Sequence, residues 1–427
     1  MLRMIWNQLR NRWRNNISIL LELCLVFCFL WYITDYFFVL NYNYHLPSHQ
    51  SLENTWQIKL GTLPDTHPEY QKAAADSVEK EANFLRIIDR LKQMPEVEAV
   101  AFFRDMSTPG GESYYGRSIF MPQDTTSWIY GMWHASDIRG DYFKVFHYTD
   151  PQGKEVSLQD FQVNENSVVL DEAFAQLLFP DGQAVGKEIV CDMNAKVTYR
   201  VVGVVGNTKR FDYLRPTKKF YTFERANGGN CHYYEIAIRV KNGVKEAEMT
   251  GAFRNRLTSE LRIGNYFLKS FDSYEHIHQQ TDRSFGISNE IRSNMLLLLF
   301  FLLNIILCVI GTFWYRISRR RGEIGLQMAM GATRANIRWL FYLEGLCLLT
   351  VSGIIAMFIE VQFVALDMVE TLGAYDGGNY LPDDKPLRFL ITNFITWCIL
   401  AVSIVIAIYI PANQASHMNP SDALRDE

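Results

Sequence analysis

The chain has 427 residues, enough for more than one folded unit, and its formal net charge of -4 argues against a nucleic-acid-binding protein. Its mean hydropathy is close to zero, but this average combines four apolar blocks with one long polar block. Most cysteines lie in the apolar blocks, so their spacing predicts neither a disulfide framework nor a zinc site. Only Cys191 and Cys231 lie in the polar block. A bond between them stays open, because sequence alone does not establish their distance.

The N-terminal stretch, residues 1–16, combines arginines with apolar residues at helical spacing. This pattern predicts an amphipathic helix that lies in the cytoplasmic membrane interface. The alternative is a positively charged tail without regular structure.

The first apolar block, residues 17–40, is long enough to cross a bilayer, which takes about 20 mostly apolar residues. A cleaved signal peptide would be shorter and would end in a small-x-small site. This block lacks such a site and carries Glu22 and Asp35. We therefore expect a retained membrane span.

The polar block, residues 41–293, contains two segments with a strand–helix–strand pattern. The expected elements are residues 56–60, 73–94 and 97–103 in the first segment and 234–240, 244–261 and 266–271 in the second. The first helix is expected to bury Val78, Ala82, Leu85, Ile88 and Leu91. The similarity of the two segments indicates an internal repeat that packs into one α+β layer.

Between the repeats, residues 110–229 are rich in short strand-like runs with Gly, Pro and Asp between them, which predicts an inserted β-rich part. The block contains neither an HExxH nor a GxSxG motif. Glu275, His276 and His278 are more typical of a polar helix than of a metal site. We expect no catalytic residue and no bound metal in this chain.

The remaining apolar blocks, residues 294–315, 339–366 and 389–410, complete a set of four expected spans. The third span carries Glu344 and Glu360. Acidic residues within spans are functional candidates, as Glu22 and Asp35 of the first span are too. The favoured interpretation is that these acids lie near interfaces or face the bundle interior, and the alternative is a proton relay.

The distribution of basic residues predicts the orientation of the spans. Arginines dominate the N-terminal flank and the link over residues 316–338, whereas the link over residues 367–388 is mostly acidic. We therefore expect both termini, the first link and the tail over residues 411–427 in the cytoplasm. The large polar block then lies outside, as expected for a multi-pass protein of the cytoplasmic (inner) membrane with a periplasmic domain.

The cytoplasmic link contains a short predicted helix over residues 323–330. Gly331 is suited to end this helix in the left-handed conformation, and Thr333 is suited to cap the next one. Ile324 and Met328 share a face at helical spacing. Such a helix is suited to dock in a groove on a cytosolic partner.

At this link the sequence resembles a known family, the MacB/FtsX/LolC-type permeases of ABC transporters. The residues that carry the resemblance are Arg321-Gly322-Glu323-Ile324-Gly325, Ala329-Met330-Gly331-Ala332-Thr333, Phe341 and Glu344, and the tail residues Pro411, Ala412, Ala415, Pro420, Ala423, Leu424 and Arg425. The runs Gly140–Phe146, Val168–Glu172, Ala184–Lys187 and Val201–Val205 are similar to family runs in the outer block.

The resemblance implies a membrane α-helical fold with four transmembrane helices and a large α+β extracytoplasmic domain. That domain would have a repeated porter part, residues 51–109 and 230–275, and an inserted Sabre-like part, residues 110–229. It also implies a coupling helix that engages an ATPase. The residues assigned to this contact are Glu323, Ile324, Gly325, Met328, Ala329, Gly331, Ala332 and Thr333.

The nucleotide is expected on another chain. A P-loop needs GxxxxGK[ST], and the nearest match here, Gly186-Lys187, is followed by Glu188. We therefore expect no cofactor in this chain, and ATP and Mg in a separate ABC ATPase subunit.

The permease would form a homodimer or a heterodimer with a second permease and would contact membrane lipid but no nucleic acid. Its expected role is export or extraction of a peptide, lipid or drug-like substrate, with a periplasmic adaptor and an outer-membrane channel as further partners. The alternatives are FtsX-like regulation of a cell-wall hydrolase and LolC-like lipoprotein release.

Overall fold

The computed structural model describes residues 13–193, 195–366 and 385–417. Its described residues divide into a helical unit, residues 13–43, 287–366 and 385–417, and an α+β unit, residues 44–286. Most of the predicted interfacial helix, of the acidic loop and of the C-terminal tail falls outside the described residues.

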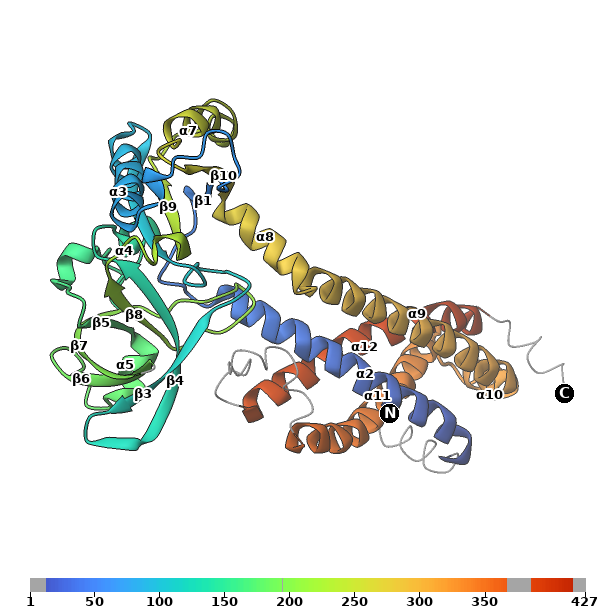
Figure 1. Ribbon diagram of the computed structural model, residues 1–427. Coiled ribbons are helices and arrows are strands. Elements are labelled where there is room, and N and C mark those ends of the chain that lie inside the picture. The colour runs from blue at the N-terminus through green and yellow to red at the C-terminus, as the bar shows by residue number, and fades with distance from the viewer. Residues whose placement is uncertain (1–12, 194, 367–384, 418–427) are drawn as a thin grey trace. The chain divides into compact units, whose positions relative to one another are not determined.

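The helical unit contains four helices that are long and apolar enough to cross a membrane (Figure 1). They are α2 (Trp13–His45), α9 (Ile287–Arg319), α11 (Arg334–Ala365) and α12 (Lys385–Ser416). Each helix extends beyond the expected apolar block, because polar residues at its ends continue the helical hydrogen bonding. Helix α12 even continues through Pro411. The predicted fold class, four apolar helices with a large α+β domain, is confirmed.

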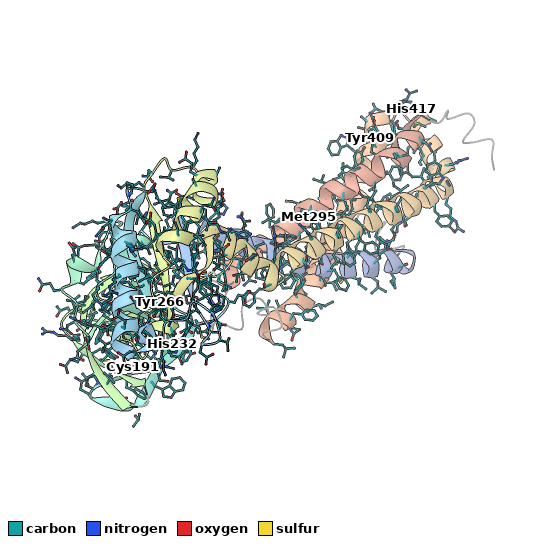
Figure 2. All side chains as sticks on the ribbon, turned by 45° about the horizontal axis from the view of Figure 1, so that its top comes forward. Cys191, His232, Tyr266, Met295, Tyr409 and His417 are labelled. Atoms are coloured by element: carbon teal, nitrogen blue, oxygen red, sulfur yellow. The ribbon has the colours of Figure 1, made fainter. Side chains whose placement is uncertain are left out.

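The four helices share one apolar core, to which Leu349 and Ala356 of α11 and Leu400 and Ile408 of α12 contribute fully buried side chains. Close packing between α11 and α12 requires a small residue at Gly345, where a β-carbon would come within 2.4 Å of Ile408 Cδ1. Large apolar side chains also line the outside of this unit. Figure 2 labels two of them, Met295 and Tyr409, which point away from the core.

The α+β unit is organised around a sheet whose first four strands lie in the order β10-β1-β9-β2. These strands are β1 (Thr55–Thr62), β2 (Val97–Arg104), β9 (Tyr234–Val240) and β10 (Tyr266–Ser273). Helix α3 (Ser77–Gln93) connects β1 to β2. A short helix α6 (Glu246–Glu248), a π-helical turn (Met249–Phe253) and α7 (Arg254–Glu260) connect β9 to β10. Figure 1 shows α3 and α7 at the same end of this unit, where both cover the apolar core of the sheet. The two repeats therefore interleave within one antiparallel layer.

The predicted apolar face of α3 is wrong in part. Val78 is 76% exposed, and Ala82 and Leu85 are only half-buried, whereas Phe84, Ile87, Ile88 and Leu91 are fully buried. The buried residues follow the i, i+3, i+4, i+7 spacing that faces one side of a helix. The large ring of Phe84 packs against Phe102 of the sheet and turns the helix to this face.

The inserted part forms a closed ring of six strands. They are β3 (Tyr115–Met121), β4 (Asp124–Asp137), β5 (Ser167–Asp171), β6 (Glu188–Met193), β7 (Ala195–Val205) and β8 (Lys219–Glu224). The order β4-β3-β6-β7-β5-β8 closes because β8 also pairs with β4 in parallel. Helix α5 (Glu172–Leu178) inserts Phe174 into the core of the ring.

The two cysteines of this unit form no disulfide and lie in separate cores. Cys191 is buried on β6 inside the ring (Figure 2). Cys231 is buried beneath α3, where its Sγ lies 3.1 Å from the hydroxyl of Tyr266. The disulfide that the sequence left open is not formed in this structure.

Candidate functional site

The predicted docking helix is α10, Arg321–Ala329, and hydrogen bonds define both its C-terminus and the start of α11. The Gly331 N–H donates to Met328 O and the Ala332 N–H donates to Gln327 O, each at 3.0 Å. These two bonds form the motif in which a left-handed residue ends a helix, and Gly331 has φ +101°. The Thr333 hydroxyl then accepts a hydrogen bond from the Asn336 N–H at 3.2 Å and caps α11. The reversal between α10 and α11 is therefore tightly determined.

The face of α10 that the sequence assigned to docking faces the helical core. Ile324 is only 3% exposed, Gly325 is buried, and Met328 packs against the same apolar cluster. Residues four positions apart lie on the same side of a helix, so Ile324 and Met328 pack together against the helical unit. In this structure Ile324, Gly325 and Met328 thus fasten α10 to the bundle, and their contact with a partner stays a prediction.

The opposite face of α10 is exposed. Leu326 is 52% exposed and Met330 is 72% exposed, and Glu323 and Ala329 lie on the surface beside them. Glu323, Leu326 and Met330 have the i, i+3, i+7 spacing of one helical face. We call these three residues the α10 outer face. It offers an apolar surface with an acidic edge.

A buried ion cluster lies where α10 begins. The Arg316 guanidinium donates to Glu344 Oε1 and the Arg320 guanidinium donates to Glu344 Oε2, both at 2.9 Å. Arg316 also donates to the Asn16 side-chain oxygen at 2.5 Å. Glu344 is nearly fully buried and both arginines are largely buried. The cluster thus joins α2, α9 and α11 at the residue that directly precedes α10.

This cluster suits transmission of force rather than catalysis. Both oxygens of the carboxylate are paired with guanidinium groups, so none is left to act as a base. Removing one partner from a buried ion pair is strongly destabilising, because it leaves a charge without compensation. The three helices must therefore move together around Glu344 or break these contacts.

The other acidic residues of the spans also contact neighbouring helices. Asp35 of α2 forms a two-contact ion pair with Arg388 of α12, with one distance of 2.8 Å. Glu22 accepts a hydrogen bond from Cys308 Sγ at 2.7 Å. Glu360 is fully buried on α11. The favoured interpretation, that the acids face the interior of the bundle, agrees with these positions.

Sequence reasoning missed the arginines of the cluster and two of the α10 outer-face residues. Arg316 and Arg320 were used only to orient the spans, although Glu344 belongs to the family pattern and needs a cationic partner when buried. Leu326 and Met330 lie within or next to the predicted helix. Their exposure depends on which side of α10 packs on the bundle.

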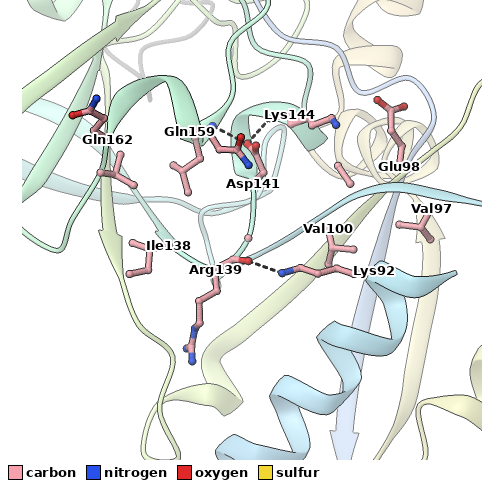
Figure 3. Close-up of a pocket in the computed structure, with 14 residues that line it drawn as sticks. Lys92, Val97, Glu98, Val100, Ile138, Arg139, Asp141, Lys144, Gln159 and Gln162 are labelled. Atoms are coloured by element: carbon pink, nitrogen blue, oxygen red, sulfur yellow. Dashed lines mark hydrogen bonds between the residues drawn. The ribbon is translucent and has the colours of Figure 1, made fainter.

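The α+β unit has a cavity of about 510 Å³ between the start of β2, the loop after β4 and the 3₁₀ turn Leu158–Phe161 (Figure 3). Lys92 donates to the Arg139 carbonyl oxygen at 2.7 Å. The Asp141 carboxylate accepts from the backbone N–H groups of Lys144 and Leu158. Burial raises the pKa of Asp141. Because Lys92 and Asp141 form hydrogen bonds with nearby backbone groups, the cavity suits binding rather than acid–base chemistry.

Among the described residues, no three His, Cys, Asp or Glu side chains are grouped as a metal site would need.

Four apolar helices, a short connecting helix with an exposed face and a large α+β unit define a multi-pass membrane protein of the permease class. A family model described as MacB-like periplasmic core domain matches residues 41–256, and one described as FtsX-like permease C-terminal matches residues 295–420. The chain belongs to this MacB-like and FtsX-like family of ABC transporter permeases. It is accordingly an inner-membrane protein with a domain of the periplasmic type, and permeases of this type work with ABC ATPases.

Two curated relatives are macrolide export ATP-binding/permease proteins. MacB 1 of Yersinia pestis bv. Antiqua is 25% identical over 300 residues, which is 68% of this chain and 43% of the relative. MacB of Neisseria gonorrhoeae is 24% identical over 348 residues, which is 80% of this chain and 49% of the relative. The chain thus spans about half the length of the curated relatives it matches.

Two solved structures are also similar to this chain. The periplasmic region of MacB from Actinobacillus actinomycetemcomitans has 14% sequence identity and a TM-score of 0.32, and the match covers 54% of this chain and 93% of that one. The extracellular domain of the transporter YknZ from Gram-positive bacteria has 14% identity and a TM-score of 0.30, with coverage of 50% and 100%.

Proposed function

We propose that this chain is the permease subunit that couples ATP hydrolysis on a separate ATPase subunit to movement of its α+β unit. The observation that carries the proposal is the α10 outer face. An exposed apolar helical face whose ends are tightly determined suits a docking contact, since little flexibility is lost when a partner binds. ATP and Mg would bind to the partner.

The orientation required by this proposal follows from charge. Arg316, Arg319, Arg320 and Arg321 end α9 and begin α10, and Arg334 begins α11. Such clusters favour the cytoplasmic side of a membrane. Helix α9 runs on from α8 (Tyr274–Ser284), the last element of the α+β unit. With α10 in the cytoplasm, the α+β unit lies on the periplasmic side.

The ion cluster supplies a route for the movement. A partner that displaces α10 acts on Arg320, which directly precedes it, and so on Glu344 of α11 and on α9 itself. Because helix packing is bistable rather than freely deformable, a small displacement at one end can shift whole helices. Helix α9 then carries that shift towards the α+β unit along the chain.

The proposed process is export. It is supported by the relatives, which are named as macrolide export proteins, and by the match of this chain to the MacB-like periplasmic core domain. The permease would work as a homodimer or heterodimer, and α9 suits the contact because it is the least buried of the four spans. A periplasmic adaptor and an outer-membrane channel would complete the export path.

The docking proposal can be tested by reconstitution of this chain with candidate ABC ATPase subunits from the same organism. Leu326→Asp and Met330→Asp should each lower ATPase binding and abolish its stimulation by the permease. Leu177→Asp is the matched control, because Leu177 is exposed to a similar degree on α5 of the α+β unit. Normal stimulation by both α10 variants would reject the docking face.

The export proposal is tested by co-purification of the intact complex. Recovery of an adaptor and an outer-membrane channel supports it. Recovery of a cell-wall hydrolase, or of a lipoprotein carrier, instead would replace export by regulation or by lipoprotein release.

A further inference from the structure

Glu360 is a buried acid of α11 that takes no part in the coupling site. Its side chain is 0% exposed, and it lies about four and a half helical turns along α11 from Glu344. The carboxylate of Asp35 is close enough to interact electrostatically with Glu360. The thiols of Cys24 and Cys28 on α2 also lie near Glu360. Asn393 of α12 is the polar side chain that faces it.

The hydrogen bonding of Glu360 differs from that of the other buried acids. Asp35 is satisfied by Arg388, and Glu344 is satisfied by two arginines. No described residue donates a hydrogen bond of regular geometry to either Oε1 or Oε2 of Glu360. The Asn393 Nδ2 group donates to the Phe389 carbonyl of its own helix at 3.0 Å, which leaves the Asn393 Oδ1 atom without a donor.

The carboxyl group of Glu360 and the side-chain oxygen of Asn393 therefore both lack a hydrogen bond of regular geometry from any described residue. An ionised carboxylate at this position would be a buried charge without a counter-ion, with the negative charge of Asp35 nearby. Arg388 does not relieve this in the arrangement of this structure. Its Nε and Nη2 groups donate to Asp35, and its buried Nη1 group donates to no described residue, Glu360 included. A protonated carboxyl group has an O–H donor and so supplies the hydrogen that is missing.

We propose that Glu360 is a proton-binding site of the helical unit. In the arrangement of this structure the carboxyl group holds a proton and donates it to the Asn393 side-chain oxygen. A movement of α11 relative to α2 and α12 that lets water reach the carboxyl group releases the proton to that water and leaves a carboxylate with which Arg388 can pair. Proton binding and helix arrangement are then thermodynamically linked, so each affects the other. The site is a single one rather than a relay, since Asp35 and Glu344 are held as ions by their arginines.

Infrared spectroscopy of the full chain in lipid nanodiscs tests the protonation directly. The difference spectrum between wild type and Glu360→Gln at neutral pH should contain the carbonyl stretch of a protonated carboxylic acid, and this band should shift in heavy water. Asp35→Asn should lose a carboxylate band instead. A wild-type spectrum in which Glu360 contributes only carboxylate bands would overturn the proposal.

A chemical probe tests the protonation of Glu360 independently and uses only the wild-type chain. Dicyclohexylcarbodiimide enters apolar regions and modifies carboxyl groups that carry a proton. Mass spectrometry of the wild-type chain should locate the adduct on Glu360 and not on Asp35. Labelling of Asp35 with Glu360 unmodified would contradict the assignment.

The neutral isosteres should differ in stability. Glu360→Gln replaces a neutral group and should change the thermal unfolding midpoint by no more than about 2 °C. Asp35→Asn leaves Arg388 without its counter-ion and should lower the midpoint by several times that shift. A large change at position 360 in either direction would show that the native group is charged.

Discussion

The guanidinium of Arg320 lies 2.9 Å from Glu344 Oε2, which joins the residue that precedes α10 to the middle of the next helix in sequence. Both side chains are buried or largely buried. The contact means that α10 is held to the bundle at its start by charge and along its length by Ile324. Helix α10 is therefore part of the helical unit rather than a free loop.

Replacing Glu344 should test this contact most strongly. Glu344→Gln removes the buried counter-charge of Arg316 and Arg320 and should destabilise the helical unit by about 3 kcal/mol, the lower end for breaking a buried pair. Thermal unfolding monitored by tryptophan fluorescence would measure the loss.

The double variant Glu344→Gln with Arg320→Gln provides the control. It should lose less than the sum of the two single changes, because residues in direct contact are not additive. Additive losses would show that the two groups do not interact.

The end of α10 requires a left-handed residue. Gly331→Val should introduce strain of about 1–2 kcal/mol at φ +101° and displace the start of α11. ATPase stimulation should fall, whereas Gly331→Asn should retain most of it, because Asn tolerates this conformation. No other atom lies within 4 Å of a β-carbon at this position, so steric clash cannot explain the difference. Equal activity of the two variants would argue against the backbone explanation.

The two faces of α10 should respond differently to the same substitution. Ile324→Asp buries a carboxylate in the apolar core and should lower the unfolding midpoint strongly. Leu326→Asp places the same group on the surface. It should change the free energy of unfolding by no more than about 0.5 kcal/mol, the range of ordinary surface substitutions. Measuring stability and ATPase binding for both variants separates packing from docking. If Ile324→Asp were stable and only failed to bind, Ile324 would belong to the docking face after all.

The α+β unit should lose stability in mild acid through His134. Burial lowers the pKa of this imidazole to about 3, and Lys219 and Arg210 add to the effect. In the unfolded chain His134 binds a proton with a pKa near 6.5, whereas in the folded chain it stays neutral at that pH. The contribution is therefore intact above pH 6.5 and is lost as pH falls towards 3, by roughly 1.4 kcal/mol per pH unit.

The variant His134→Phe removes this titration and keeps the stacking on Tyr221. The carbonyl oxygen of Ser107 keeps its hydrogen bond from the Tyr142 hydroxyl at 2.8 Å. Unfolding midpoints of the wild type should drop more steeply between pH 7 and pH 5 than those of His134→Phe. Parallel pH profiles would exclude His134 as the cause.

The thiol groups of Cys191 and Cys231 should be inaccessible in the folded chain. Both are buried in separate cores, so a maleimide reagent should modify them only after denaturation. Non-reducing and reducing electrophoresis should show the same mobility for a chain in which the five membrane-unit cysteines are replaced by serine or alanine. A mobility shift on reduction would reveal a bond that this structure lacks.

The sequence by itself determined the four spans, the stop after α10 at Gly331, the start of α11 at Thr333, and the family. These features depend on local signals: a run of apolar residues long enough for a bilayer, a residue without a β-carbon and a capping hydroxyl. The two interleaved repeats were also predictable, since strands and helices have different periods.

Only the tertiary structure decided which side of each element is buried. Ile324 and Leu326 lie two residues apart on α10, and their roles depend on where the bundle lies. The exposure of Val78 depends in the same way on the sheet beneath α3. Closure of the six-stranded ring, the pairing of Arg320 with Glu344 and the lack of a partner for Glu360 all involve residues far apart in sequence. Such contacts follow from packing over the whole unit, and no local pattern encodes them.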